Sequence, residues 1–125
     1  MEFVSTTSAP AAIGPYNQAV RVGDLVFTSG QIALTPDGGE EVLGMGIEEQ
    51  TKQVLTNLSY VLEAAGSSLQ KVVKTTIFLA DMEDFSRVNE IYGTFFGDHK
   101  PARSTVAVKT LPKNALIEIE AIAEV

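Results

Sequence analysis

The sequence predicts an α+β fold, a two-layer sandwich in which two helices cover one face of a mixed β-sheet. Segments that alternate apolar and polar residues occur near the start, in the middle and at the end of the chain. Two segments with apolar residues at three- and four-residue intervals lie between them, which is typical of amphipathic helices. The predicted order is therefore β-β-α-β-α-β-β. A chain of 125 residues predicts a single domain, 1–125, with a buried core.

The first half of the chain predicts two strands and one long helix. Residues 1–15 contain two prolines and a glycine at 10–15, so we expect a loop there. The segment 19–32 predicts two short strands around a Gly23-Asp24 turn. The clearest helix is 47–65, where one apolar stripe runs along the segment; its members are Ile47, Thr51, Val54, Leu55, Leu58, Val61, Leu62 and Ala65.

The second half predicts a strand, a helix and two final strands. The segment 71–79 is rich in β-branched residues, as strands are. A second helical stripe then consists of Phe85, Val88, Tyr92 and Phe95, and Gly97 ends the helix. We expect the last two strands, near 103–108 and 116–125, to form a hairpin through 111–114.

The predicted hairpin gives a candidate site. Side chains alternate between the two faces of a strand, so the hairpin places Arg103 and Glu118 together on the face turned away from the core. Glu120 shares that face, and the pattern alone does not choose between the two glutamates. Because the same face also carries apolar residues and the helices cover only the other one, we expect another subunit to cover it.

Composition excludes several classes of function. The net charge is −7 and the isoelectric point is about 4.6, which makes nucleic acid an unlikely partner. The chain has no cysteine and one histidine, so thiol chemistry is excluded and no metal site is expected. The N-terminus lacks a secretory signal, and no apolar run is long enough to span a membrane. These features predict a soluble cytoplasmic protein.

Five side chains are candidates for chemistry, and each has a structural alternative. Arg103 can clamp a carboxylate, or form an interface ion pair with Glu118 or Glu120. Glu118 can position or deprotonate a water, or be a solvated carboxylate. Tyr16 can close a pocket or pack on a neighbour, Ser29 can bind an anion or stabilise a turn, and Asn89 can bind a ligand or hold a loop.

Five segments together resemble the RidA family, also called YjgF-like, of reactive-intermediate deaminases. They are APAAIGPYNQAV at 9–20, TSGQI at 28–32, LEAAGSSLQKVVKTTIFLADMEDFSRVNEIYGTFF at 62–96, PARSTV at 101–106 and LPKNALIEIEAIA at 111–123. The resemblance covers essentially the whole chain. It implies a chorismate-mutase-like fold, assembly as a homotrimer and sites in the clefts between subunits.

The resemblance also implies an activity: hydrolysis of 2-aminoacrylate and related 2-imino acids to 2-keto acids and ammonia, without a cofactor. It implies that Arg103 binds the substrate carboxylate and that Glu118 orients the attacking water, while Tyr16, Ser29 and Asn89 line the cleft. Two alternatives stay open. Relatives have been described as endoribonucleases or translation inhibitors, and the third class is a non-catalytic sensor or chaperone-like binder of small metabolites.

Two positions depart from the pattern of the family. Thr105 stands where the family often has cysteine, and the resemblance implies that this residue contributes backbone contacts to the substrate, so we expect the change to be tolerated. Lys100 stands where a phenylalanine often precedes the PAR motif, and it alters the rim of the pocket and therefore the expected substrate range.

Overall fold

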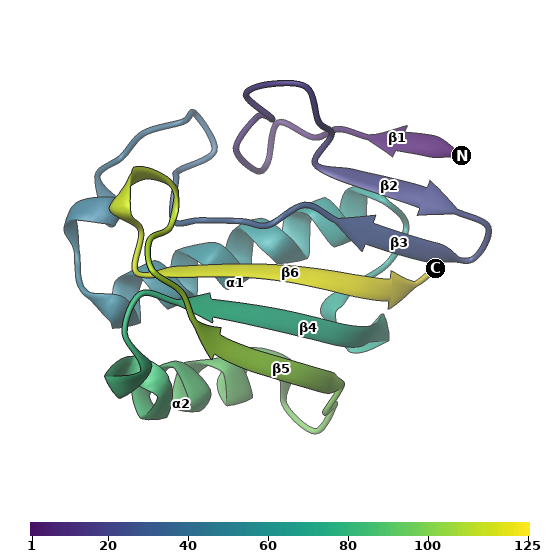
Figure 1. Cartoon of the computed structure of the whole chain (residues 1–125). Coiled ribbons are helices and arrows are strands. Elements are labelled where there is room, and N and C mark those ends of the chain that lie inside the picture. The colour runs from purple at the N-terminus through teal and green to yellow at the C-terminus, as the bar shows by residue number, and fades with distance from the viewer.

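The computed structural model describes residues 1–125 and confirms the α+β class. Two helices lie on one face of a six-stranded mixed sheet (Figure 1), whose strand order is β1-β2-β3-β6-β4-β5. Strands β4 and β5 are parallel, and all other neighbours are antiparallel. The elements are β1 (Glu2–Val4), β2 (Ala19–Val22), β3 (Leu25–Thr28), α1 (Ile47–Ala64), β4 (Val72–Leu79), α2 (Phe85–Phe96), β5 (Ala102–Ala107) and β6 (Ile117–Glu124).

Two expectations about the sheet are wrong. The N-terminal segment is not entirely a loop, because β1 pairs with β2 at the edge of the sheet. Its three residues are too few to show a period of two. The expected hairpin of the last two strands is also wrong: β5 pairs with β4 in parallel, and β4 lies between β5 and β6.

The core lies between the sheet and the helices, in one cluster of 22 buried residues. The predicted stripe of α1 is confirmed, since Val54, Leu55, Leu58, Val61 and Leu62 are fully buried. Alternate residues of β6 face the helices and lie beside buried residues of β4; Ile119, for example, pairs with Ile77. The helices thereby fix which face of the sheet each strand residue occupies.

The opposite face of the sheet is not covered by either helix (Figure 1). Phe27 of β3 is 43% exposed there and lies beside Ile122 of β6, and Glu118 and Glu120 follow along the same strand. Short 3-10 helices lie in the connections, at Val42–Gly44, Leu69–Lys71, Met82–Asp84 and Pro112–Asn114. Neither of the two longer helices has the length and apolar character that crossing a membrane requires.

Candidate active site

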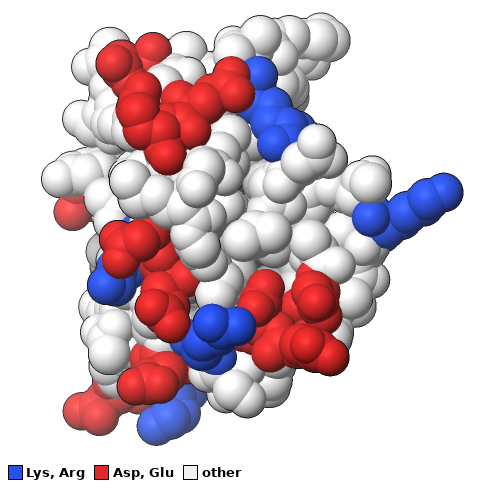
Figure 2. All heavy atoms as spheres, turned by 90° about the vertical axis from the view of Figure 1, so that its left-hand side faces the viewer, with Lys and Arg blue, Asp and Glu red and all other residues white.

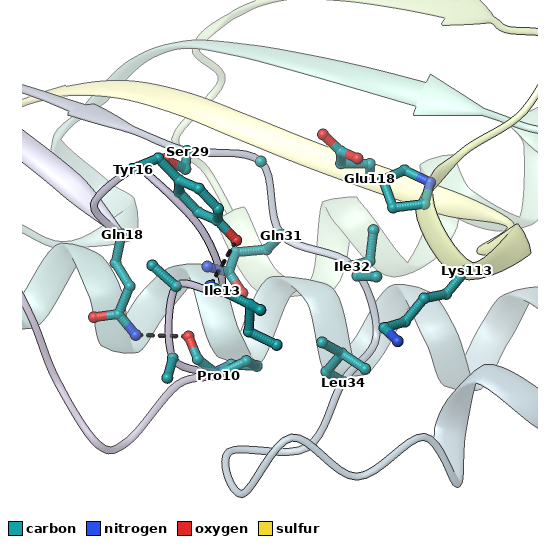
Figure 3. Close-up of a pocket in the computed structure, with 14 residues that line it drawn as sticks. Pro10, Ile13, Tyr16, Gln18, Ser29, Gln31, Ile32, Leu34, Lys113 and Glu118 are labelled. Atoms are coloured by element: carbon teal, nitrogen blue, oxygen red, sulfur yellow. Dashed lines mark hydrogen bonds between the residues drawn. The ribbon is translucent and has the colours of Figure 1, made fainter.

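A cavity of about 600 Å³ lies beside β6 and is lined by Tyr16, Ser29, Gly30, Lys113 and Glu118, among others. Figure 3 shows the Glu118 carboxylate on β6 and the Tyr16 ring on the N-terminal loop beside Ser29. We call this the Glu118 pocket. Its side chains come from three segments distant in sequence, and the pairing of β3 with β6 brings two of these segments together.

A local irregularity of the sheet forms one wall of the Glu118 pocket. Phe27 pairs with Ile122 and Gln31 pairs with Ile119, so residues 28–30 lie opposite only residues 120–121. One extra residue in a strand makes a bulge, which bends the strand and interrupts its pairing. The bulge brings Gly30 against Glu118: a Cβ atom on Gly30 would lie 2.0 Å from Oε2 of Glu118. Glycine is therefore what allows the carboxylate to occupy this position.

The Glu118 carboxylate is half-buried and has no cation beside it. The four ion pairs of the chain involve other residues. Burial raises the pKa of the Glu118 carboxyl, and the negative charge of Glu120 raises this pKa further. Glu120 lies two residues along the same face but does not line the pocket. A carboxylate with a raised pKa at the wall of a cavity can accept a proton or orient a water.

Buried amide side chains hold the loops around the Glu118 pocket. Gln18 donates hydrogen bonds to the carbonyls of Thr6, Ala9 and Pro10, which fixes the N-terminal loop. Asn57 of α1 donates to the carbonyls of Ile32 and Leu34 at 3.3 and 2.8 Å. A buried carbonyl without a partner costs free energy, so these amides stabilise the two loops that form the wall.

Other candidate residues of this pocket have structural contacts. The Ser29 hydroxyl donates to the carbonyl of Asn17, and the Tyr16 hydroxyl accepts a hydrogen bond from the amide of Ile13. Tyr16 is 52% exposed, so most of its ring remains available at the mouth of the cavity. The Ser29 hydroxyl is a donor to the backbone and is not activated by a histidine.

A second cavity, of about 430 Å³, lies on the other side of the sheet between α2 and β5. It is lined by Asn89, Tyr92, Arg103 and the basic segment at His99 and Lys100, among others. We call it the Arg103 pocket. No aspartate or glutamate lines it, although the chain as a whole is acidic. It is therefore suited to a small anion.

Arg103 lies between the sheet and two aromatic rings of α2. Its guanidinium carbon is 4.9 Å from the centre of the Tyr92 ring and 5.5 Å from that of Phe85. Arg103 takes part in none of the four ion pairs. The guanidinium is thus half-buried without an anionic partner within the chain.

The prediction that Arg103 and Glu118 share one face of the sheet is wrong. Arg103 pairs in register with Thr75, whereas Glu118 pairs with Phe78. Paired residues point the same way, and two positions three apart on one strand point in opposite directions. Thr75 faces the helices, because it is fully buried and hydrogen-bonded to Tyr92. Arg103 therefore lies on the helix face and Glu118 on the open face.

Thr105 also lies on the helix face, beside Ile77. Its hydroxyl oxygen is buried and has no hydrogen-bond partner, and the residue lines neither cavity. The candidate residues therefore fall into two groups: the Glu118 pocket contains Tyr16, Ser29 and Glu118, and the Arg103 pocket contains Asn89 and Arg103. Within one chain they do not form a single site.

Three residues of these pockets are not among the candidates that the sequence predicts. Gly30 belongs to the TSGQI segment, Lys113 to the expected turn at 111–114, and Tyr92 to the predicted apolar stripe of the second helix. Tyr92 is indeed 7% exposed, but its ring also faces Arg103. The contact between Tyr92 and Arg103 follows from the pairing of β5 with β4, which places Arg103 beside Thr75 on the helix face. The sequence pattern does not predict this pairing. No group of three His, Cys, Asp or Glu side chains in the structure could hold a metal ion.

Comparison with known proteins identifies relatives along the whole chain. The family model described as Endoribonuclease L-PSP matches residues 6–125. A Mus musculus protein named 2-iminobutanoate/2-iminopropanoate deaminase is 53% identical over 122 residues, covering 98% of this chain and 90% of the mouse protein. A Pyrococcus abyssi protein named as a RutC family member is 52% identical, with coverage of 98% and 95%.

Solved structures agree with these relatives. Escherichia coli TdcF with bound serine has a TM-score of 0.94 and 42% identity, covering 100% of this chain and 99% of TdcF. The Escherichia coli YjgF gene product has a TM-score of 0.93 and 46% identity, with coverage of 99% and 98%. The resemblance in the sequence is thus confirmed, and the chain belongs to the RidA family, also named YjgF, RutC and endoribonuclease L-PSP.

Proposed function

We propose that this protein is an enamine/imine deaminase that hydrolyses 2-aminoacrylate and related 2-imino acids to 2-keto acids and ammonia. The observation that carries the proposal is a pair of unsatisfied charges. Arg103 is a half-buried cation without an anion, and Glu118 is a half-buried carboxylate without a cation. A substrate that carries a carboxylate next to an electrophilic carbon matches both.

The names of relatives support this reaction class. The mouse and rat relatives, 53% and 52% identical, are named 2-iminobutanoate/2-iminopropanoate deaminase. The bound serine of TdcF is a small molecule with the carboxylate that the proposal assigns to Arg103. In this chain the planar guanidinium of Arg103 offers paired donors to such a carboxylate.

The proposed site is completed by a second copy of the chain in a homotrimer. One subunit supplies Arg103 and Asn89, and the next supplies Tyr16, Ser29 and Glu118. A head-to-tail contact of this kind joins two different surfaces, and it closes into a ring when the rotation between copies is 120°. The uncovered sheet face beside Glu118 is a suitable surface for that contact, because it combines apolar residues with the pocket.

The proposed chemistry needs positioning more than a strong nucleophile. 2-Aminoacrylate converts to its imine tautomer, whose C2 carbon is electrophilic. Glu118 takes a proton from water as the water oxygen bonds to C2, and it passes this proton to the imine nitrogen, which becomes an amine. In the tetrahedral intermediate Glu118 then moves the hydroxyl proton to the amine nitrogen. The C–N bond breaks, and ammonia leaves as the C=O bond of the keto acid forms. Arg103 fixes the carboxylate, so that C2 faces the water.

The test is release of ammonia and keto acid from enzymatically generated 2-aminoacrylate, with Arg103→Ala as the control. Loss of the paired charge-assisted hydrogen bonds should remove about 2–4 kcal/mol of transition-state stabilisation, which lowers kcat/KM roughly 30- to 1000-fold. Arg103→Lys should recover only part of the rate, because an ammonium lacks the planar fork. Near-normal turnover by Arg103→Ala contradicts the proposal.

An endoribonuclease is the second candidate, because the family description carries that name. The charge of this chain disfavours it. The net charge is −7, and acidic side chains form several groups on the side of the molecule seen in Figure 2, whereas RNA is bound through cationic surfaces. Cleavage of RNA that is lost in Arg103→Ala would favour this candidate. Keto-acid binding without turnover would instead favour a non-catalytic metabolite-binding protein.

A further inference from the structure

The guanidinium of Arg103 is held by aromatic rings instead of by a carboxylate. Half-buried arginines are normally paired with an acidic side chain, but Arg103 has none. The rings of Tyr92 and Phe85 lie 4.9 and 5.5 Å from its guanidinium carbon, within the range of cation–π contacts. Attraction to the rings therefore takes the place of the missing ion pair.

This arrangement leaves the hydrogen-bond donors of Arg103 free. The N–H groups of a guanidinium lie in its plane and point outward from its edge. None of the ion pairs of the chain uses these donors of Arg103, whereas a carboxylate partner would occupy two of them. An arginine held in this way remains able to bind a substrate carboxylate with both donors of its fork.

Tyr92 is itself fixed at both ends. Its hydroxyl lies 2.7 Å from the Thr75 hydroxyl, and Thr75 is fully buried on β4, directly beside Arg103 in the sheet. Its ring stacks on Phe96, with 4.4 Å between the ring centres. Burial raises the pKa of the Tyr92 hydroxyl, so the phenol stays neutral and keeps this hydrogen bond. The ring is therefore tied to the strand next to the one that carries the arginine.

We infer that Tyr92 is a positioning residue for Arg103, and that its ring orients the guanidinium so that the free N–H edge faces the carboxylate of the substrate. The inference rests on the proposed function, in which Arg103 binds that carboxylate. In this inference Tyr92 acts through Arg103 and not on the reacting atoms. Its removal should therefore weaken binding of substrate and product through Arg103.

The test compares Tyr92→Leu with Tyr92→Phe, using 2-oxobutanoate as the probe for binding and 2-aminoacrylate for turnover. Tyr92→Leu removes the ring and should raise the Kd of the keto acid by roughly 3- to 30-fold, the range of cation–π energies. Tyr92→Phe keeps the ring, so its Kd should stay within about twofold of the wild type, although the unpaired Thr75 hydroxyl should lower its Tm. If Tyr92→Leu does not fold, Tyr92→Met replaces it, because methionine fills more of the volume.

A double-mutant cycle shows whether Tyr92 acts through Arg103. In the Arg103→Ala background, Tyr92→Leu should change the Kd of 2-oxobutanoate by less than about twofold, because the group that it positions is gone. Val61→Ala, a core truncation in α1, provides a destabilised control whose Kd should equal that of the wild type.

Three results overturn the inference: an unchanged Kd in Tyr92→Leu, an equal loss in the Arg103→Ala background, or a similar loss in Val61→Ala. None of these results contradicts the proposed function as long as Arg103→Ala has a reduced rate of deamination. Near-normal deamination by Arg103→Ala would instead remove the proposed function.

Discussion

At the scale of single residues, the environment of Glu118 separates it from Glu120 although both lie on one face of β6. Only Glu118 lines the cavity. Glu118→Gln keeps the shape and removes the anionic acceptor, so turnover should fall by about 10²–10⁴. Steady-state turnover of Glu120→Gln should stay within a few-fold of the wild type. The assignment fails if Glu120→Gln is the slower enzyme, or if Glu118→Gln loses keto-acid binding as severely as Arg103→Ala.

The raised pKa of Glu118 gives a second residue-scale prediction, on stability. The folded chain holds the Glu118 proton more tightly than the unfolded chain, because burial penalises the carboxylate. The stabilisation from this group is complete below the ordinary glutamate pKa and is lost as pH rises through the raised pKa. Glu118→Gln should therefore have a higher Tm than the wild type at pH 7, and the difference should shrink toward about pH 4. A lower Tm of Glu118→Gln at pH 7 would show that a cation stabilises the carboxylate in the assembled protein.

Gly30 offers a test of the position of Glu118 without altering its chemistry. A Cβ atom at residue 30 would overlap the Glu118 carboxylate, and the backbone there is not in the left-handed region. Gly30→Ala should therefore displace the carboxylate and lower turnover by about tenfold or more. Gly44→Ala is the matched control, since a Cβ atom there has open space. Equal turnover of the two variants would contradict the idea that Gly30 makes room for Glu118.

At the scale of elements, α1 stabilises the Glu118 pocket through Asn57. This amide is fully buried and binds two carbonyls of the segment that follows the β3 bulge. Asn57→Ala should lower the free energy of unfolding measured in urea by about 1–3 kcal/mol, because it leaves those carbonyls without a partner. Thr56→Ala, at a half-buried neighbouring position whose hydroxyl bonds only to the Lys52 carbonyl of the same helix, should lower the free energy of unfolding by less than about 0.5 kcal/mol. An Asn57→Ala variant no less stable than Thr56→Ala would contradict this role.

The elements also show which features the sequence predicts and which it does not. The helices and β6 each bury one face, and this burial gives the sequence a period of 3.6 in the helices and of two in β6. Both helices and the buried face of β6 were therefore predicted correctly. Which strand pairs with β5 depends on contacts between residues distant in sequence. The expected hairpin with β6 was therefore wrong, and it placed Arg103 on the wrong face of the sheet. Strand β1 is too short for any period. The candidate side chains were therefore identified by residue type and resemblance, while their division into two pockets required the structure.

At the scale of the whole molecule, each pocket contains half of the proposed site. A single chain offers a cation on one face of its sheet and a carboxylate on the other. The proposed trimer brings the two together at each subunit boundary, and sedimentation at micromolar concentration should show three chains per particle. A stable monomer would contradict the assembly.

The most direct test of the central claim is subunit complementation between Arg103→Ala and Glu118→Gln. Each variant alone should be nearly inactive in 2-aminoacrylate hydrolysis. When the two are co-expressed in equal amounts, about one quarter of the boundaries in randomly mixed trimers join an intact Arg103 to an intact Glu118. The mixed protein should recover up to about a quarter of wild-type turnover, and separately assembled variants that are combined without exchange of subunits should recover none. Mixed trimers that stay as inactive as the single variants would contradict a site shared between subunits.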